Sequence, residues 1–224
     1  MITERRPRRD AVERRARIIE IARDVLLADP DATLETIAAA AGLTRRTIYG
    51  HVASREALIA EVIEVGAARI AGSVDAALAL AMVGAADVDP ADRESNIEAD
   101  PALAVARLGA ALWDEVGDVR ASAALAVRDP HRGRVAELLA PVRSRLRDIV
   151  AIGSRSGRFR DDLDAEVLAR LIERAAIAVL DEAAADTIPT SLARRLVMID
   201  GLAIAGLDRT DAAAVADRID GHRR

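Results

Sequence analysis

The chain has 224 residues, of which 51% are hydrophobic and only 1% aromatic, and its formal net charge is −5. Its apolar content is mostly Ala, Leu, Val and Ile, and because Ala and Leu favour helices over strands, an all-α fold is predicted. The absence of cysteine excludes disulfides, thiolate metal sites and cysteine nucleophiles. No apolar run approaches the ~18–20 residues of a membrane span, and the N-terminus lacks the apolar segment of a signal peptide. A cytoplasmic protein is therefore expected.

The charge is unevenly distributed along the chain. Residues 1–60 carry 11 arginines and 9 acidic residues, whereas the remainder carries 21 arginines and 28 acidic residues. Such asymmetry suggests a basic face carried by an acidic body, which leaves nucleic acid as a possible partner despite the negative total.

The first predicted elements are a flexible basic arm over residues 1–9 and a helix over residues 10–28, capped by Asp10 and closed by Pro30. The basic arm either contacts DNA or is a solvated tail. Apolar residues at spacings of three and four indicate one buried stripe along the helix. The stripe consists of Val12, Ala16, Ile19, Ala22 and Leu26.

Two short helices follow. Thr33 caps a helix that ends at about Ala41, directly before Gly42, where a left-handed residue typically ends a helix. Thr44 caps the next helix, which ends at about His51. Two short helices joined by a turn of about three residues form the plan of a helix-turn-helix.

The rest of the chain is predicted to be helical, with loops at polar segments. A break is expected at Gly72-Ser73, a kink at Pro141, and a frayed tail over the last fifteen residues. The predicted helices cover residues 54–71, 74–85, 101–127, 129–154, 164–185 and 190–206.

The helix-turn-helix has a distinct outer face. Ile37 and Ala41 lie one turn apart on the first helix, Ile48 and Val52 lie one turn apart on the second, and Leu43 can fill the space between them. The remaining side chains suit the major groove of DNA, because arginine can donate two hydrogen bonds to guanine and the others can bind phosphates or bases. These side chains are Thr44, Arg45, Arg46, Thr47 and Tyr49.

This stretch resembles the DNA-binding domain of the TetR family of repressors. The family usually has a small residue in place of Arg46, phenylalanine in place of Val52, and lysine in place of Arg55. The resemblance rests on Thr33, Ile37-Ala38, Ala41-Gly42-Leu43-Thr44, Thr47-Ile48-Tyr49, His51, Ser54-Arg55-Glu56 and Leu58.

The resemblance implies two sets of DNA contacts. Base edges would be approached by Thr44, Arg45, Arg46 and Thr47, and the DNA backbone would be held by Thr33, Tyr49, His51 and Arg55. Each residue also has a simpler interpretation. The threonines can be helix caps, Tyr49 can pack against the first helix, His51 can close the second, and the arginines can be solvated.

A homodimer is expected, because one short helix reads too few bases and two-fold dimers read the two halves of a palindromic operator. Two apolar stripes near the C-terminus could pair with a second copy, as the final two long helices do in the family. The alternative is that they pack within one chain. The stripes are Leu168, Leu171, Ile172, Ala175 and Val179, followed by Leu192, Leu196, Ile199 and Ala203.

The resemblance also implies a pocket for a small-molecule effector that releases the repressor from its operator. The candidate ligand contacts are Met82, Arg107 and Trp113, although Trp113 can equally be a core residue. With so few aromatic residues, an aliphatic or mixed ligand is favoured over a stacked planar one.

The predicted domains are a helix-turn-helix domain over residues 1–53 and a helical effector-binding and dimerisation domain over residues 54–224. No enzyme activity, cofactor, metal or membrane partner is expected. Acidic residues at 161–166 fall at a helix start, where the helix dipole favours them, and the three histidines lack metal-ligand spacing. A ligand-independent regulator and a helical protein-interaction module are the alternatives.

Overall fold

The computed structural model of the chain describes residues 6–83, 100–126, 132–185 and 187–221. These residues form ten helices and no strand, which confirms the predicted all-α fold. The chain divides into two compact units. The N-terminal unit comprises Met1–Arg69 and Asp118–Leu138, and the C-terminal unit comprises Ile70–Gly117 and Leu139–Arg224. None of the described helices is long and apolar enough to cross a membrane.

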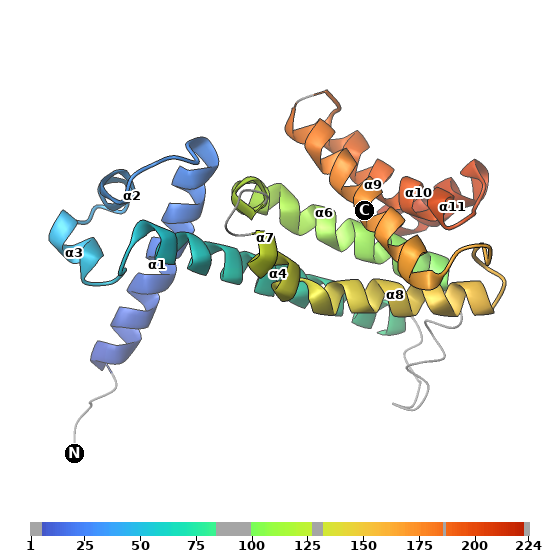
Figure 1. The fold of residues 1–224 in the computed structure, drawn as a ribbon, viewed down its shortest axis with the longest axis horizontal. Coiled ribbons are helices and arrows are strands. Elements are labelled where there is room, and N and C mark those ends of the chain that lie inside the picture. Colours follow the sequence, from blue (N-terminus) through green and yellow to red (C-terminus); the bar gives the residue numbers. More distant parts are fainter. Residues whose placement is uncertain (1–5, 84–99, 127–131, 186, 222–224) are drawn as a thin grey trace, which may run out of the picture. The chain divides into compact units, whose positions relative to one another are not determined.

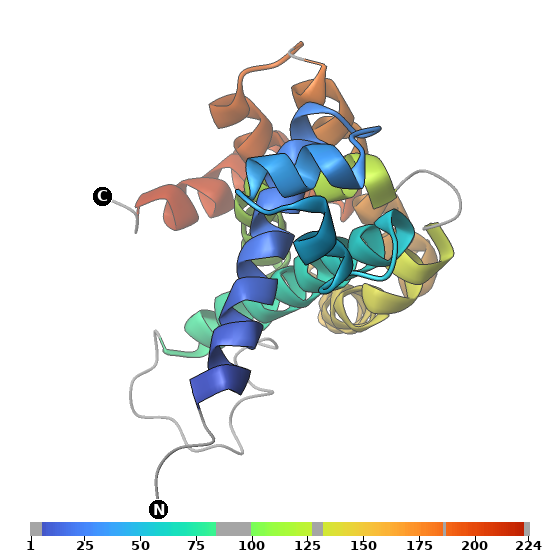
Figure 2. The ribbon, with the colours of Figure 1, turned by 90° about the vertical axis from the view of Figure 1, so that its left-hand side faces the viewer.

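The N-terminal unit contains α1 (Arg6–Ala28), α2 (Leu34–Ala40), α3 (Arg45–Tyr49), the first half of α4 (Arg55–Val83) and α7 (Arg132–Leu138). Figures 1 and 2 show α2 and α3 as two short helices joined by a tight turn beside the longer α1. Their apolar faces share one core, so the helix-turn-helix folds around a common centre. That core includes Ile18, Ala22, Leu26, Ile37, Ile48, Val52, Leu58 and Val62.

Helix α1 differs from the prediction at its start. It begins at Arg6, within the predicted flexible arm, because Pro7 in a first turn needs no hydrogen-bond partner for its nitrogen. The predicted apolar stripe is correct only in its second half. Val12 is 68% exposed, and the buried side chains begin at Ile18, because the first turns of α1 extend beyond the core of this unit (Figure 2).

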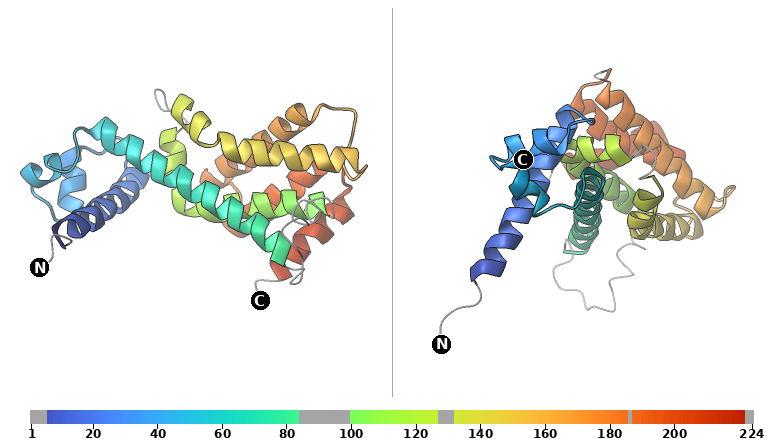
Figure 3. Two further views of the ribbon diagram at one scale, coloured as in Figure 1. Left: turned by 90° about the horizontal axis from the view of Figure 1, so that it is seen from below. Right: turned by 60° about the vertical axis from the view of Figure 1, so that its left-hand side comes forward.

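Helix α4 is continuous over 29 residues, so the predicted break at Gly72-Ser73 is wrong (Figure 3). A glycine inside a helix costs about 1 kcal/mol relative to alanine. Around it, Ile70, Val74 and Leu78 are buried at helical spacing. Their burial outweighs that cost, since fully burying one such side chain contributes about 1.5–3 kcal/mol.

The C-terminal unit contains the second half of α4, most of α6 (Pro101–Ala126), α8 (Ala140–Arg155), α9 (Ala165–Ala184), α10 (Thr190–Ile204) and α11 (Arg209–Gly221). Helix α9 packs extensively on α10, and both α8 and α11 pack on this pair (Figure 1). The kink predicted at Pro141 is wrong. Pro141 lies in the first turn of α8, where its missing N–H costs no intrahelical hydrogen bond.

The predicted frayed tail is instead the helix α11. The carboxylate of Asp208 accepts a hydrogen bond from the backbone N–H of Asp211 at 2.9 Å and so caps its first turn. Ala212, Val215 and Ala216 are buried in the core of the C-terminal unit. Their small side chains allow close packing but give only a weak apolar pattern in the sequence, which explains the error.

Candidate nucleic-acid interface

The two helices of the predicted helix-turn-helix begin with the same capping arrangement. The Thr33 hydroxyl accepts a hydrogen bond from the backbone N–H of Thr36 at 3.1 Å, and the Thr44 hydroxyl accepts one from Thr47 at 3.2 Å. Between them, Gly42 has φ = +66°, the left-handed conformation expected from its position. The helix ends and the turn are therefore specified locally.

Helix α3 separates a buried face from an exposed one. Ile48 is completely buried, and Thr47 is half-buried. The outer face carries Thr44, Arg45, Arg46 and Tyr49, all exposed, and Tyr49 is 46% accessible. This division matches the one predicted from the sequence except at Thr47, which was expected on the outer face. It presents hydrogen-bond donors and a ring on a short helix, the arrangement that a groove-binding helix requires.

The two arginines at the head of α3 have different surroundings. Arg45 Nε lies 3.2 Å from Glu35 Oε1, and its guanidinium lies 5.7 Å from the centre of the Tyr49 ring. The Tyr49 hydroxyl donates to the same Glu35 oxygen at 3.4 Å. The side chain of Arg46, by contrast, is exposed and makes no hydrogen bond or ion pair in the part of the chain that the structure describes. Arg46 can thus engage DNA with its whole guanidinium, whereas Arg45 can do so only through its two Nη groups while its Nε stays with Glu35.

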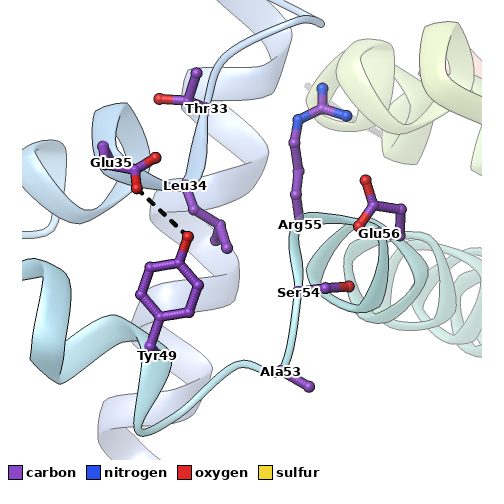
Figure 4. Close-up of a pocket in the computed structure, with 8 residues that line it drawn as sticks. All are labelled: Thr33, Leu34, Glu35, Tyr49, Ala53, Ser54, Arg55 and Glu56. Atoms are coloured by element: carbon purple, nitrogen blue, oxygen red, sulfur yellow. Dashed lines mark hydrogen bonds between the residues drawn. The ribbon is translucent and has the colours of Figure 1, made fainter.

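A hollow of about 340 Å³ opens beside Tyr49 (Figure 4). Thr33, Tyr49 and Arg55, three of the four residues predicted to hold the DNA backbone, line it. Glu35 and Glu56 also line it, so the hollow contains both donors and carboxylates. The fold brings together residues that are 22 positions apart in the sequence, from the start of α2, the end of α3 and the start of α4.

Arg55 already has partners within the chain. Its Nε donates to the carbonyl of Ala32 at 2.8 Å, and its Nη2 donates to the carbonyl of Pro30 at 2.6 Å. These bonds attach the turn between α1 and α2 to the start of α4. Arg55 therefore has a structural role that the sequence did not indicate, and its predicted phosphate contact stays a prediction.

His51 is half-buried in the turn after α3, and its carbonyl accepts a hydrogen bond from Arg15 Nη1 at 2.7 Å. The same arginine pairs with Glu61 on α4. Arg15 thus ties α1 to the end of the helix-turn-helix, a role that nothing in the local pattern of α1 indicated. The predicted phosphate contact of His51 is untested by this arrangement.

The predicted dimer-interface residues divide into two groups. Leu168, Ile172 and Val179 are buried in the chain's own core, which supports the intramolecular alternative for these three. The others remain wholly or partly accessible and could pair with a second copy, and Ile177, 45% exposed, adds to them. Leu171, Leu192 and Ala203 are exposed, and Ala175, Leu196 and Ile199 are half-buried.

The predicted ligand contacts do not meet in one described cavity. Trp113 is 7% exposed and packs with Val179, Ala183 and Val197. Arg107 is half-buried on α6, and its Nη1 is buried without a hydrogen-bond partner among the described residues. Burial, reinforced by repulsion from Arg218, lowers the pKa of Arg107. The side chain of Met82 lies outside the described residues.

No group of three or more His, Cys, Asp or Glu side chains within the described ranges could hold a metal ion. The site therefore consists of helix caps, an exposed helix face and the hollow beside it.

Residues 18–62 match the family model described as bacterial regulatory proteins, tetR family. Among curated proteins, none matches the chain in sequence. Similar solved structures include PfmR, a TetR family transcriptional regulator from Thermus thermophilus, with 20% identity and a TM-score of 0.62 over 86% of this chain and 96% of that one.

A gamma-butyrolactone receptor (an ArpA-like protein) shares 19% identity at a TM-score of 0.60, over 95% of this chain and 99% of its own. RolR in complex with resorcinol shares 19% identity at a TM-score of 0.59, over 94% and 96%. Identities this low show a common fold. The chain thus shares the fold of these structures, and its residues 18–62 match the model of the tetR family of bacterial regulatory proteins.

Proposed function

We propose that the chain is a cytoplasmic, homodimeric repressor that binds a palindromic operator and leaves it when a small molecule binds. The observation that carries the DNA-binding part is the outer face of α3, where Thr44, Arg45, Arg46 and Tyr49 are exposed while Ile48 is buried. An exposed arginine can donate two hydrogen bonds to guanine, which discriminates between base pairs.

The hollow beside Tyr49 supports a phosphate contact next to this face. It combines the hydroxyls of Thr33, Tyr49 and Ser54 with the first turn of α4. Helix N-termini favour anions, because their first N–H groups lack intrahelical partners and carry the positive end of the helix dipole. A DNA phosphate seated there would fix the orientation of α3, while Arg46 reads bases.

Dimerisation is supported by the exposed apolar side chains of the last two long packed helices. Leu171 on α9 and Leu192 on α10 are 38% and 44% exposed. A second copy covering them would remove apolar surface from water and set the spacing of two DNA-binding helices. The substitution of either leucine by Glu is expected to yield monomers in light scattering. Leu27→Glu, at an equally exposed leucine of α1, is the matched control and should leave the dimer intact.

Control by a ligand is supported by the fold and by two proteins that share it. Their names record resorcinol and a gamma-butyrolactone as ligands. A ligand can shift this protein between operator-binding and released states only if it binds one state more tightly. Trp113, the only tryptophan, provides a fluorescence signal in the C-terminal unit for such binding.

The decisive experiment is fluorescence anisotropy with duplex DNA from upstream of the protein's own gene, at several salt concentrations. Salt-dependent binding is expected for the wild type, because arginines displace counterions from the phosphates. The pair Arg45→Ala with Arg46→Ala should lose about 1–3 kcal/mol of binding free energy for each specific contact removed. Arg209→Ala, an exposed arginine of α11, is the control. Binding that is absent, or unchanged in the double variant, would contradict the proposal.

A further inference from the structure

Glu35 is an acidic side chain on the surface that would face DNA. Its Oε1 accepts the hydrogen bond from the Tyr49 hydroxyl and lies 3.2 Å from Arg45 Nε (Figure 4 shows the Tyr49 bond). Arg45 also lies over the Tyr49 ring. One carboxylate oxygen on α2 thus joins two side chains that stand one turn apart on α3.

The three contacts form a closed triangle that orders long side chains before DNA arrives. An arginine side chain loses conformational freedom when it is immobilised at an interface, so prior ordering reduces the entropic cost of binding. The triangle is exposed, with Arg45 74% and Glu35 45% accessible, so its effect on folding stability is small. Its effect on the orientation of the Arg45 and Tyr49 side chains is larger, since both contact the same Glu35 oxygen.

The carboxylate would also act on binding through its charge. A phosphate in the wrong register near Glu35 would be repelled, and Arg45 would have to leave Glu35 to bring its Nε to a phosphate. Both effects would weaken binding to unrelated sequences, and selectivity depends on such penalties as well as on favourable contacts.

We propose that Glu35 is a specificity-determining positioning residue: it orients Arg45 and Tyr49 toward one base register and suppresses binding to non-operator DNA. This inference rests on the proposed DNA-binding function. Nothing in the linear sequence pairs position 35 with position 45, and only the packing of α2 against α3 brings them together.

The test compares a duplex that the wild-type protein selects from a random library with a scrambled duplex of the same length and composition. Glu35→Gln should bind the scrambled duplex about threefold more tightly and lower the ratio of the two affinities by a similar factor, as expected for one exposed ion pair. Glu35→Asp keeps the charge but is one methylene shorter. It should lower the ratio without tightening binding to the scrambled duplex.

Glu20→Gln is the matched control, because it removes the same charge from an exposed position on α1. It should leave the affinity ratio unchanged. A second readout needs no DNA: Tyr49 is the only tyrosine, so its ring resonances report the triangle directly. They should shift in both Glu35 variants and stay in place in Glu20→Gln, with unchanged thermal denaturation in all three.

Three results would overturn the inference. They are a wild-type ratio of the two DNA affinities in Glu35→Gln, the same in Glu35→Asp, or Tyr49 resonances that do not move in these variants. The first two show that positioning is unimportant, and the third shows that the triangle does not form in solution. If the wild-type protein binds neither duplex, the proposed function itself fails, and the role of Glu35 fails with it.

Discussion

The turn before α9 depends on a contact between Gly153 and Phe159, the only phenylalanine of the chain. A Cβ atom at position 153 would lie 2.0 Å from Phe159 Cδ2 and 2.7 Å from its Cγ. The ring cannot easily withdraw, because the backbone N–H groups of Arg158 and Phe159 both donate to the Gly153 carbonyl, at 2.9 and 3.0 Å. We therefore expect Gly153→Ala to expel the ring from its 4% exposed position.

The magnitude follows from two opposed effects. Losing the packing of a buried phenylalanine destabilises a protein by about 3–5 kcal/mol, whereas replacing glycine by alanine inside a helix stabilises it by about 1 kcal/mol. Gly153→Ala should therefore lower the free energy of unfolding by about 2–4 kcal/mol. In a Phe159→Ala background the clash is absent, so Gly153→Ala should raise the free energy of unfolding by about 1 kcal/mol. The sign of the effect reverses with the neighbouring side chain.

Urea denaturation followed by circular dichroism and by Trp113 fluorescence measures all four corners of this double-mutant cycle. Gly72→Ala is the matched control and should stabilise the protein. A Cβ atom at position 72, inside α4, would meet no atom within 4 Å apart from its chain neighbours and the backbone of its own helix. Additive effects, or a Gly153→Ala variant as stable as the wild type, would refute the reasoning. They would show that the ring does not rest on Gly153.

Four further predictions concern the helix-turn-helix and the C-terminal unit. Arg46→Ala should weaken binding to the selected duplex by about 1–3 kcal/mol and affect the scrambled one much less, as measured by anisotropy; equal losses on both would indicate a phosphate contact instead. Thr44→Ala removes the cap of α3 and should lower stability by about 1 kcal/mol in urea denaturation, whereas Thr44→Ser should not. Arg107→Met removes a buried nitrogen that has no hydrogen-bond partner among the described residues, so the ligand-free variant should be at least as stable as the wild type in thermal denaturation. A clear loss of stability would show that the guanidinium is hydrogen-bonded in solution. Burial raises the pKa of Asp200, so the stability that this carboxyl contributes is complete below its pKa in the unfolded chain and is lost as pH rises through the higher folded value. Asp200→Asn should remove this pH dependence and stabilise the protein at neutral pH. Denaturation curves at pH 4 and pH 7 that change equally would contradict the prediction.

The sequence was most informative where structure is local. The caps at Thr33 and Thr44, the left-handed Gly42 and the buried Ile37 and Ile48 all follow from short-range rules, because each depends on neighbours within about four residues. The side chains of α3 that do not pack into the core then form its exposed face. For the same reason, the resemblance of this short segment to a family could be stated from the sequence.

Predictions that required knowing which helices meet were less successful. The apolar positions of α1 and of α9 could be identified, but not which of them face a neighbour within the chain. Val12 is exposed, whereas Leu168, Ile172 and Val179 are buried in the chain's own core. Helical periodicity identifies a face but does not name its partner.

The same limit applies to the surface predicted to meet DNA. Two exposed arginines in succession look equivalent in the sequence, and they differ only because α2 places Glu35 beside Arg45 and leaves Arg46 without a partner in the described ranges. Arg55 turns toward the Pro30 and Ala32 carbonyls for a similar reason. Local sequence thus specified the helices, their caps and the outer face of α3. Tertiary packing alone decided which charges on that face are already paired, because ion pairs between helices depend on distances in space.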